Sequence, residues 1–324
     1  MHKIYENWPE LAEEYYLKDL KKIKLKKISH IVFTGMGGSG AIGDIFKSIL
    51  SKTSIHVTIV KGYTIPKTVD NKTLVIPISI SGNTVETIST LKLAHKKRAK
   101  ILAITSGGKM KNFCLENKID LRIINMEHSP RASFTIFLYS MLNILEPILP
   151  IDKLDILKSI NDMKKLRQNI FSQNVNEENN ALKLATWIKN IPIIYYPYGL
   201  ESVAVRFKNS LQENAKIHCM IEDIIETGHN GIESWENKSK INPIFIIGSN
   251  DHHKTKERWI IMEKFFIKKN IDFYKIKSIN GGILTKIINL IYFFDYVSIY
   301  YAIIKKTDPS PVKSIEYIKE NIKK

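Results

Sequence analysis

The sequence predicts an α/β protein with two lobes, each of them a parallel sheet flanked by helices. Short runs of β-branched apolar residues alternate with helical segments, and this alternation occurs twice along the chain. The length of 324 residues also exceeds the usual size of a single hydrophobic core. We therefore expect an N-terminal lobe over residues 1–150 and a C-terminal lobe over residues 151–324.

The first half of the chain opens with an amphipathic helix, predicted over residues 5–19 from the helical spacing of Trp8, Leu11 and Tyr15. Strands are then predicted at residues 29–34, 54–60, 73–79, 100–105 and 121–124. Helices are predicted at residues 41–51, 85–97 and 133–145. Because strands alternate with helices, the sheet should be parallel and its connections right-handed.

The second half repeats this scheme after helices predicted at residues 152–171 and 181–189. Strands are predicted at residues 191–196, 241–247 and 271–276. The predicted helices run from after Leu200 to about Lys216, over residues 256–269, and over residues 284–305. The repeat suggests that the two lobes are related.

Composition narrows the class of protein. Hydrophobic residues make up 44% and charged residues 25% of the chain, which is typical of a globular protein. A net charge of +17 could attract nucleic acid or anionic metabolites. The lysines, however, are spread from Lys3 to Lys324, and no nucleic-acid-binding motif accompanies them. We favour a mildly anion-attracting surface and expect no nucleic-acid partner.

Location and metal content can be addressed in the same way. No uninterrupted apolar run reaches the roughly 18 residues of a membrane span, and residues 1–12 lack the apolar core of a signal peptide. Cys114 and Cys219 are too few for a disulfide framework, and no His, Cys or Glu cluster has metal-ligand spacing. We expect a cytoplasmic protein with no membrane partner and no metal.

A phosphate-binding loop is predicted between the third strand and the next helix. Ser79, Ser81 and Thr84 place three hydroxyls within six residues, around Gly82, at a helix N-terminus. Hydroxyls and backbone N–H groups donate to phosphate oxygens, and the helix dipole favours an anion. The alternative is a plain N-cap by Ser81 or Thr84, although a cap needs only one hydroxyl.

A glycine-rich turn, residues 35–40, follows the first strand and should lie at the same edge of the sheet. It could be a dinucleotide fingerprint, but no Asp or Glu ends the second strand to bind a ribose. Because the turn should lie at the same edge as the loop 79–84, we assign Gly38 and Ser39 to the phosphate site.

Several motifs in order resemble one family over nearly the whole chain. They are the hydroxyl loop 79–84, the turn 35–40, Ser129-Pro130-Arg131-Ala132, Glu213-Asn214-Ala215-Lys216, His229-Asn230, and Asp308-Pro309 with a C-terminal Lys. Together they resemble the archaeal-type bifunctional phosphoglucose/phosphomannose isomerases, which have two sugar isomerase (SIS) domains. The resemblance implies a cofactor-free aldose–ketose isomerase that acts on hexose phosphates through a cis-enediol.

The resemblance also implies roles for particular residues. Glu213 matches the base that moves a proton between C2 and C1, and His229 matches a group that opens the sugar ring from the neighbouring subunit. A homodimer with a shared active site is therefore expected. Arg131 is placed to stabilise the anionic enediolate, and Lys319 matches a C-terminal lysine that assists ring opening.

Two alternatives stay open. One is another SIS enzyme, such as an isomerase of aminosugar phosphates or an aldolase-like member. The other is a sugar-phosphate sensor without catalysis, which would keep the loop 79–84 but need neither Glu213 nor His229. The presence of both residues favours an enzyme.

Overall fold

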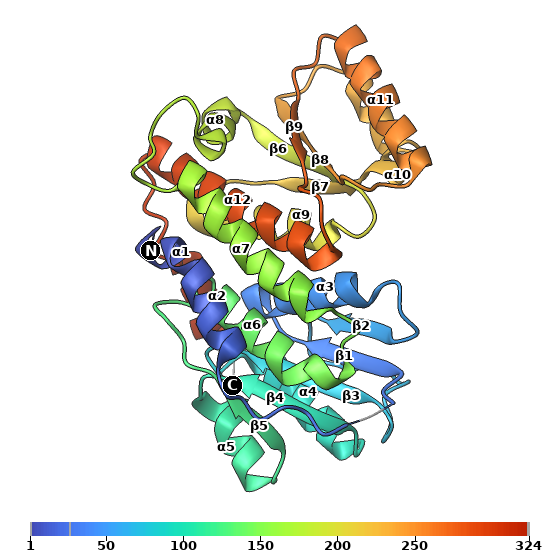
Figure 1. Ribbon diagram of the computed structural model, residues 1–324, viewed down its shortest axis with the longest axis vertical. Helices are drawn as coiled ribbons and strands as arrows, with labels where there is room; N and C mark the ends of the chain where they lie inside the picture. Colours follow the sequence, from blue (N-terminus) through green and yellow to red (C-terminus); the bar gives the residue numbers. More distant parts are fainter. Residues whose placement is uncertain (1, 26, 323–324) are drawn as a thin grey trace. The chain divides into compact units, whose positions relative to one another are not determined.

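The computed structural model describes residues 2–25 and 27–322. By its internal contacts the chain forms two compact units. Among the described residues, the N-terminal unit comprises 3–25, 27–164 and 281–288, and the C-terminal unit comprises 2, 165–280 and 289–322. The long helices α7 (Lys153–Ile170) and α12 (Ile283–Ile304) each contribute residues to both units (Figure 1).

The N-terminal unit contains a five-stranded, all-parallel sheet with the strand order β2-β1-β3-β4-β5. Its strands are β1 (His30–Thr34), β2 (His56–Val60), β3 (Leu74–Ser79), β4 (Lys100–Thr105) and β5 (Asp120–Ile123). All six residues of β3 are buried, which is expected for a central strand covered on both faces. The five predicted strands and the predicted parallel sheet are thus confirmed.

Helices cover this sheet and continue the predicted alternation. They are α2 (Trp8–Leu17), α3 (Gly37–Leu50), α4 (Val85–Lys96), α5 (Gly108–Glu116) and α6 (Phe134–Leu145), followed by the short turn η1 (Glu146–Ile148). Every residue of α6 is buried, and the Trp8 indole donates a 2.8 Å hydrogen bond to the Ala132 carbonyl. The single helix predicted over residues 5–19 is wrong in detail. The structure has α1 (His2–Glu6) and then α2, because Pro9 in the first turn of α2 cannot donate a backbone hydrogen bond.

The C-terminal unit has a four-stranded parallel sheet with the order β7-β6-β8-β9. Its strands are β6 (Ile191–Tyr196), β7 (Met220–Asp223), β8 (Ile241–Ile247) and β9 (Tyr274–Lys277). Its other elements are α8 (Asn180–Trp187), α9 (Glu201–Ser210), η2 (Leu211–Ala215), α10 (Ile224–Thr227), η3 (Gly231–Glu236), α11 (His253–Lys268) and α13 (Lys313–Asn321).

Two predictions for this unit need correction. The strand expected at residues 271–276 begins only at Tyr274, after a turn that ends α11. The helix expected to reach about Lys216 is α-helical only as far as Ser210 and continues as the π-helical turn η2, which ends at Ala215 because Lys216 adopts a left-handed conformation with φ of 57°. The fold class itself is confirmed, because both sheets are parallel and flanked by helices.

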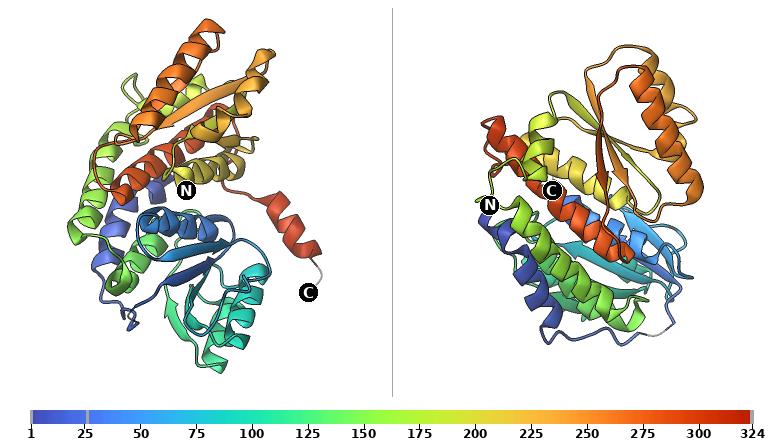
Figure 2. Two further views of the ribbon diagram at one scale, coloured as in Figure 1. Left: turned by 90° about the vertical axis from the view of Figure 1, so that its right-hand side faces the viewer. Right: turned by 45° about the horizontal axis from the view of Figure 1, so that its top comes forward.

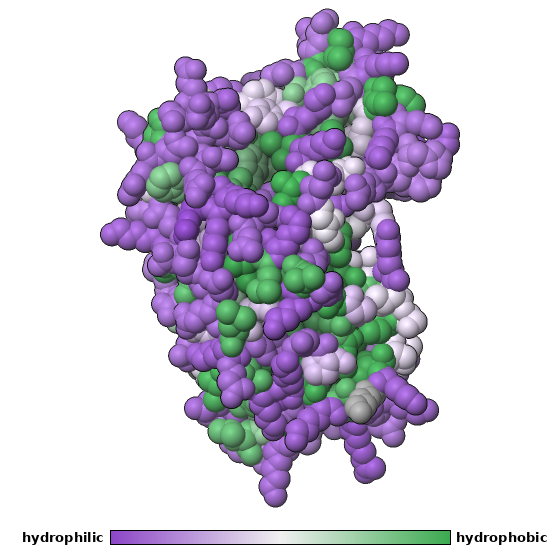
Figure 3. Space-filling model, viewed as in Figure 1, coloured by the Kyte–Doolittle hydropathy of each residue, from purple (hydrophilic) through white to green (hydrophobic). Residues whose placement is uncertain are grey.

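Helix α12 is long and apolar enough to cross a membrane by length and composition, although its sequence is interrupted by polar residues. It is the one such helix among the described residues, and 83% of its most apolar window is buried within the protein. This burial is what a core helix of a folded domain shows. The surface drawn in Figure 3 is mostly hydrophilic, which agrees with lysines spread along the chain.

Candidate functional site

The hydroxyl loop, residues 79–84, joins the end of β3 to the start of α4 in the N-terminal unit. The Gly82 amide donates to both the carbonyl and the hydroxyl of Ser79, at 3.0 and 3.1 Å. Gly82 has a φ of 71°, and a Cβ at this position would lie 1.8 Å from the Gly107 carbonyl oxygen. Only glycine fits here, so the tight turn is fixed by its sequence.

The three hydroxyls of this loop play different parts. Ser79 is fully buried, and its hydroxyl donates to the Thr84 hydroxyl at 3.0 Å, which leaves the Thr84 proton available for another acceptor. Ser81 accepts from the Asn83 amide at 3.4 Å and remains partly exposed. Thr84 occupies the N-cap position of α4, but its side chain makes no capping hydrogen bond. The arrangement is therefore not a plain N-cap, and Ser81 and Thr84 can donate to an oxyanion.

The glycine-rich turn meets the hydroxyl loop directly. Helix α3 begins at Gly37, and Ser39 in its first turn accepts a 3.3 Å hydrogen bond from the Ile80 amide. A Cβ at Gly40 would lie 2.8 Å from the Gly35 carbonyl oxygen, so the turn is also tightly closed. Strands β1 and β3 are neighbours although β2 lies between them in sequence, and parallel sheets bind ligands at such a crossover point.

The structure therefore brings together one group of predicted residues. The loops that carry Gly38, Ser39, Ser79, Ser81 and Thr84 lie at the carboxyl ends of adjacent strands, with the first turns of α3 and α4 beside them. Sequence reasoning did not single out Lys61, which directly follows β2 at the same edge. Its Cε would be 3.1 Å from a Cβ on Gly40, and its ammonium pairs with Asp44 at 2.6 Å.

Arg131 lies in the same unit, in the turn that leads into α6. It is 7% exposed, and the turn is held by Ser133, whose hydroxyl accepts from the Glu127 amide at 2.9 Å and donates to the Glu127 carbonyl at 2.7 Å. An arginine side chain carries a positive charge in proteins, and this charge acts more strongly on nearby groups where water is largely excluded. Arg131 can thus act as a fixed cation.

Glu213 lies in the C-terminal unit, within the π-helical turn η2. This turn is anchored on α12: the buried guanidinium of Arg206 pairs with the buried carboxylate of Asp295 at 2.8 Å, and Ser210 donates to the same carboxylate. Asn214 is fully buried and donates to the Ser298 hydroxyl at 2.9 Å. The neighbouring Glu213 is half-buried on a rigid support, and π-turns of this kind often occur at functional sites.

His229 and Lys319 lie on two further elements of the C-terminal unit. His229 is exposed in the loop between α10 and η3, where its amide donates to the Glu226 carbonyl at 2.9 Å. Lys319 is exposed on α13, a helix without a buried residue that stands at the end of the chain (Figure 2). Glu213, His229 and Lys319 are thus carried by three separate elements.

Sequence reasoning missed an acidic cluster at the carboxyl ends of β6 and β7. Burial raises the pKa of Glu222, the nearby Thr227 hydroxyl lowers it, and the charge of Glu226 raises it. Burial also raises the pKa of Tyr196 to about 12, with added effects from Glu201, Asp223 and Glu222. The cluster was not found because strand β7 was not predicted.

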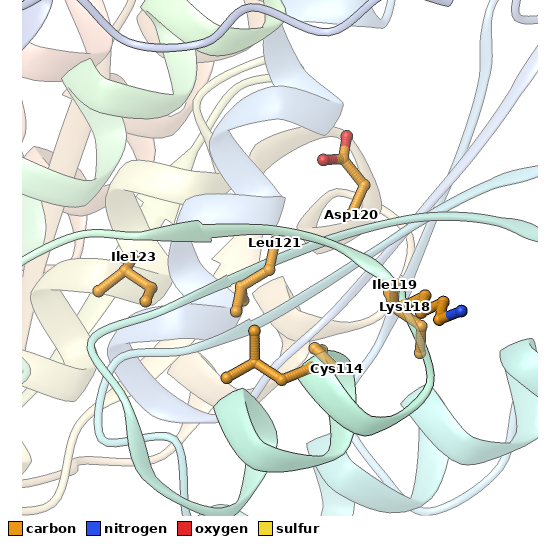
Figure 4. Close-up of a pocket in the computed structure, with 7 residues that line it drawn as sticks. Cys114, Lys118, Ile119, Asp120, Leu121 and Ile123 are labelled. Atoms are coloured by element: carbon orange, nitrogen blue, oxygen red, sulfur yellow. The ribbon is translucent and has the colours of Figure 1, made fainter.

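An open hollow lies elsewhere, along the edge strand β5 (Figure 4). It has a volume of about 490 Å³ and is lined by Cys114, Leu115, Lys118, Ile119, Asp120, Leu121 and Ile123. Its thiol is buried, which raises the pKa of Cys114 to about 11 and leaves it a poor nucleophile. The chemistry of this hollow does not match that of the hydroxyl loop, which we consider the better candidate for ligand binding.

No group of three or more His, Cys, Asp or Glu side chains within residues 2–25 and 27–322 is arranged to hold a metal ion.

Comparison with known families gives matches to both halves of the chain. The model of the SIS domain matches residues 24–146. The model described as the bacterial phospho-glucose isomerase C-terminal SIS domain matches residues 177–322.

Individual proteins match over the full length. A bifunctional phosphoglucose/phosphomannose isomerase of Caldicellulosiruptor bescii is 34% identical, covering 98% of this chain and 97% of that protein. A protein of the same name from Aquifex aeolicus is 31% identical, covering 100% and 99%. Among solved structures, the tagatose-6-phosphate ketose/aldose isomerase from Escherichia coli has a TM-score of 0.73 at 16% identity, covering 95% of this chain and 93% of that one. The last similarity concerns the fold alone.

Proposed function

Because the chain belongs to the bifunctional phosphoglucose/phosphomannose isomerase family, we propose that it interconverts glucose 6-phosphate and mannose 6-phosphate with fructose 6-phosphate. The observation that carries this proposal is the full-length similarity to proteins of this name. The hydroxyl loop 79–84 supports it, since its geometry suits a phosphate monoester. The protein is an isomerase, and the residue roles below are our assignments.

The phosphate group is assigned to the N-terminal half, residues 1–150. Ser81 and Thr84 donate their hydroxyl protons, and the amides at the start of α4 add the positive end of a helix dipole. Ser79 takes part by orienting Thr84, and Gly38 and Ser39 complete the site from the start of α3. The lysine-rich charge of the chain favours the approach of such an anion.

The proton transfer is assigned to the C-terminal half, residues 151–324. Glu213 removes the C2 proton and returns it to C1 through the cis-enediol, which is the work of a single carboxylate base. A rotation about the C2–C3 bond lets the same base act on either C2 epimer, so glucose and mannose phosphates share one intermediate. Arg131 stabilises the anionic enediolate, and a fixed cation does this better in the transition state than in the ground state.

Ring opening is assigned to His229 with help from Lys319. Hexose phosphates are mostly closed rings, and an imidazole can exchange a proton with the ring oxygen near neutral pH. By resemblance to the family, His229 acts in the active site of a second subunit, so we propose a homodimer. We also propose that the enzyme works without a cofactor, in the cytoplasm, in glycolysis and gluconeogenesis.

The direct test is a coupled assay that starts from fructose 6-phosphate and measures both aldose products. We expect both glucose 6-phosphate and mannose 6-phosphate to form, and unphosphorylated fructose to react very poorly. Formation of neither product, with fructose 6-phosphate still bound, would identify a sensor in place of an enzyme.

Activity should persist after exhaustive treatment with EDTA, and a loss that a divalent ion restores would contradict metal independence.

The shared active site has its own test. Glu213→Gln and His229→Ala should each be inactive or nearly so as pure proteins. If the two residues meet across a two-fold dimer, mixing the variants under exchange conditions should restore roughly a quarter to a half of the sites. No recovery in mixtures whose subunit exchange is verified by mass would place both residues in one subunit's site.

A further inference from the structure

Gly231, two residues after His229, lies against a carboxylate from another element. A Cβ built on Gly231 would lie 2.0 Å from Oε1, 2.6 Å from Cδ and 2.7 Å from Oε2 of Glu222. The backbone of Gly231 is not in the left-handed region, so its conformation alone does not require glycine. The Glu222 carboxylate, the end of a flexible side chain, occupies the volume that a side chain at position 231 would enter, so a larger residue there would displace it.

Glu222 enters this space from the end of β7, beneath the segment that carries His229. The next residue, Asp223, caps α10 by accepting from the amides of Ile225 and Glu226, at 2.7 and 3.2 Å. The Thr227 hydroxyl donates to the Asp223 carbonyl at 2.7 Å. The chain from Asp223 through α10 to Gly231 therefore returns to the Glu222 carboxylate, which lies against Gly231 at the start of η3.

Both ends of this segment are anchored, whereas its middle is exposed. At the far end, the buried Trp235 donates to the Tyr195 hydroxyl at 2.9 Å. In the middle, the His229 amide and the Asn230 side chain both donate to Glu226, at 2.9 and 2.8 Å. The Glu222 carboxylate at Gly231 is a further group in contact with this exposed turn.

The surroundings of Glu222 are charged on several sides. Asp223 and Glu226 come from α10 and its cap, and Tyr196 comes from the end of β6. From α11, the guanidinium of Arg258 approaches Gly228, where a Cβ would lie 2.4 Å from Nη1. The His229 turn is thus bounded by a carboxylate at Gly231 and a guanidinium at Gly228, and neither glycine can take a side chain without displacing its neighbour.

We propose that Glu222 is a positioning residue for His229: its carboxylate takes the place of a side chain at position 231 and fixes the turn that presents the imidazole. This inference rests on the proposed function, because ring opening is the step that His229 performs. Glu222 acts through the turn and does not touch the sugar. A misplacement of about 1 Å in a catalytic group can cost on the order of a hundredfold in rate, so the expected effect is measurable.

The first experiment compares Glu222→Gln and Glu222→Ala with Glu233→Gln, an exposed carboxylate of η3, as the control. We expect Glu222→Ala to lower kcat on closed-ring glucose 6-phosphate on the order of tenfold to a hundredfold, with KM nearly unchanged. Solvent-proton exchange at C2 of the open-chain sugar should fall much less. Glu222→Gln, which keeps the shape, should fall between the wild type and Glu222→Ala, and the control should match the wild type.

The second experiment moves the carboxylate to the other side of the same space. Gly231→Glu alone should be damaging, because two carboxylates then compete for one volume. The double variant Glu222→Ala with Gly231→Glu should have a kcat at least tenfold higher than that of Glu222→Ala. Wild-type kinetics in Glu222→Ala would overturn the proposal, and so would a folded double variant no more active than Glu222→Ala.

A measurement that needs no catalysis can distinguish failure of this inference from failure of the proposed function. The imidazole Hε1 signal of His229, assigned with His229→Gln, should shift or broaden in Glu222→Ala and stay in place in Glu233→Gln. A shift in a protein that turns over neither sugar would contradict the proposed function and support the positioning role. An unchanged His229 signal in Glu222→Ala would contradict the positioning role whatever the activity.

Discussion

The two sheets share one strand order, yet the loops after their equivalent strands differ in whether they contain an acidic residue. The order β2-β1-β3-β4 matches β7-β6-β8-β9 position by position, so β3 and β8 are equivalent. After β3, the loop offers the partly exposed hydroxyls of Ser81 and Thr84 and contains no acidic residue. After β8, the chain supplies a carboxylate of its own.

That carboxylate belongs to Asp251. It accepts from the Gly248 amide at 2.9 Å and from the Trp259 indole at 3.0 Å, and a Cβ at Gly248 would lie 2.0 Å from its Oδ1. These two donors of the C-terminal unit, the Gly248 amide and the Trp259 indole, therefore already have an acceptor from the chain itself. One scaffold can thus be an open anion site or a closed one, depending on whether a single acidic residue lies in the loop.

The largest expected effect separates chemistry from phosphate binding. Glu213→Gln keeps the size of the side chain but cannot accept a proton, so kcat should fall on the order of 10²–10⁴-fold for both aldoses. Substrate affinity should change little, since we assign phosphate binding to the loop 79–84 and not to Glu213. The measurement is steady-state kinetics with binding by calorimetry, and Glu233→Gln is the control. Full activity in Glu213→Gln would remove this residue as the base.

The next effect tests the contrast between the two loops directly. Ser81→Ala and Thr84→Ala each remove a charge-assisted hydrogen bond, worth about 1.5–3 kcal/mol, and should raise KM roughly tenfold to a hundredfold or more. Ser249→Ala in the equivalent C-terminal loop removes a hydroxyl that donates to the Ile279 carbonyl at 3.0 Å. It should leave KM unchanged. Equal increases in KM for both loops would break the comparison.

The sequence predicted the strands of the N-terminal sheet better than the short strand β7 of the C-terminal sheet, for physical reasons. Strands such as β3 are continuous apolar runs, and the hydroxyls of the loop follow them directly. Strand β7, with the sequence Met-Ile-Glu-Asp, is short and has no buried residue, so no apolar pattern marks it. Glu222 lies on that strand and was missed with it.

Other features depend on contacts that a single sequence does not display. Helix α9 gives way to η2 next to Ser210, whose hydroxyl donates to the buried carboxylate of Asp295, 85 residues away, and η2 ends at the left-handed backbone of Lys216. Ser79 was predicted to bind phosphate, but whether a hydroxyl faces a ligand or a neighbour such as Thr84 is decided by packing. The sequence thus indicates residue types and spacing, while burial determines how each residue is used.

A third prediction opens the closed loop. Asp251→Ala leaves the Gly248 amide and the Trp259 indole without an acceptor, and each unsatisfied donor costs about 1–3 kcal/mol. Thermal stability should fall, and inorganic phosphate should restore part of it by taking the vacated place, since a ligand of the native state stabilises it. Ser249→Ala should show no such response to phosphate. If phosphate stabilises the wild type and Asp251→Ala equally, the Asp251 carboxylate does not occupy a place where phosphate could bind.

The smallest expected effect concerns pH and the opposite edge of the N-terminal sheet, where β1 and β2 begin. His30 and His56 are paired in register there, and both ring nitrogens Nε2 approach the Thr58 hydroxyl, at 3.2 and 3.4 Å. Burial lowers the pKa of His30, as does His56, whereas Asp70 acts in the opposite direction. The native protein therefore resists protonation of His30.

The sign of the effect follows from linkage. An unfolded histidine takes up a proton near pH 6.5, whereas native His30 does so only at lower pH, so the unfolded state binds more protons as the pH falls from 7. The free energy of unfolding should decrease over that range, and His30→Gln should make the decrease shallower. The measurement is urea unfolding between pH 7.5 and pH 5, with the exposed His253→Gln as the control. Identical pH slopes for the wild type and His30→Gln would show that His30 has the same pKa in the native and unfolded states. The pairing of His30 with His56 would then not contribute to the pH dependence of stability.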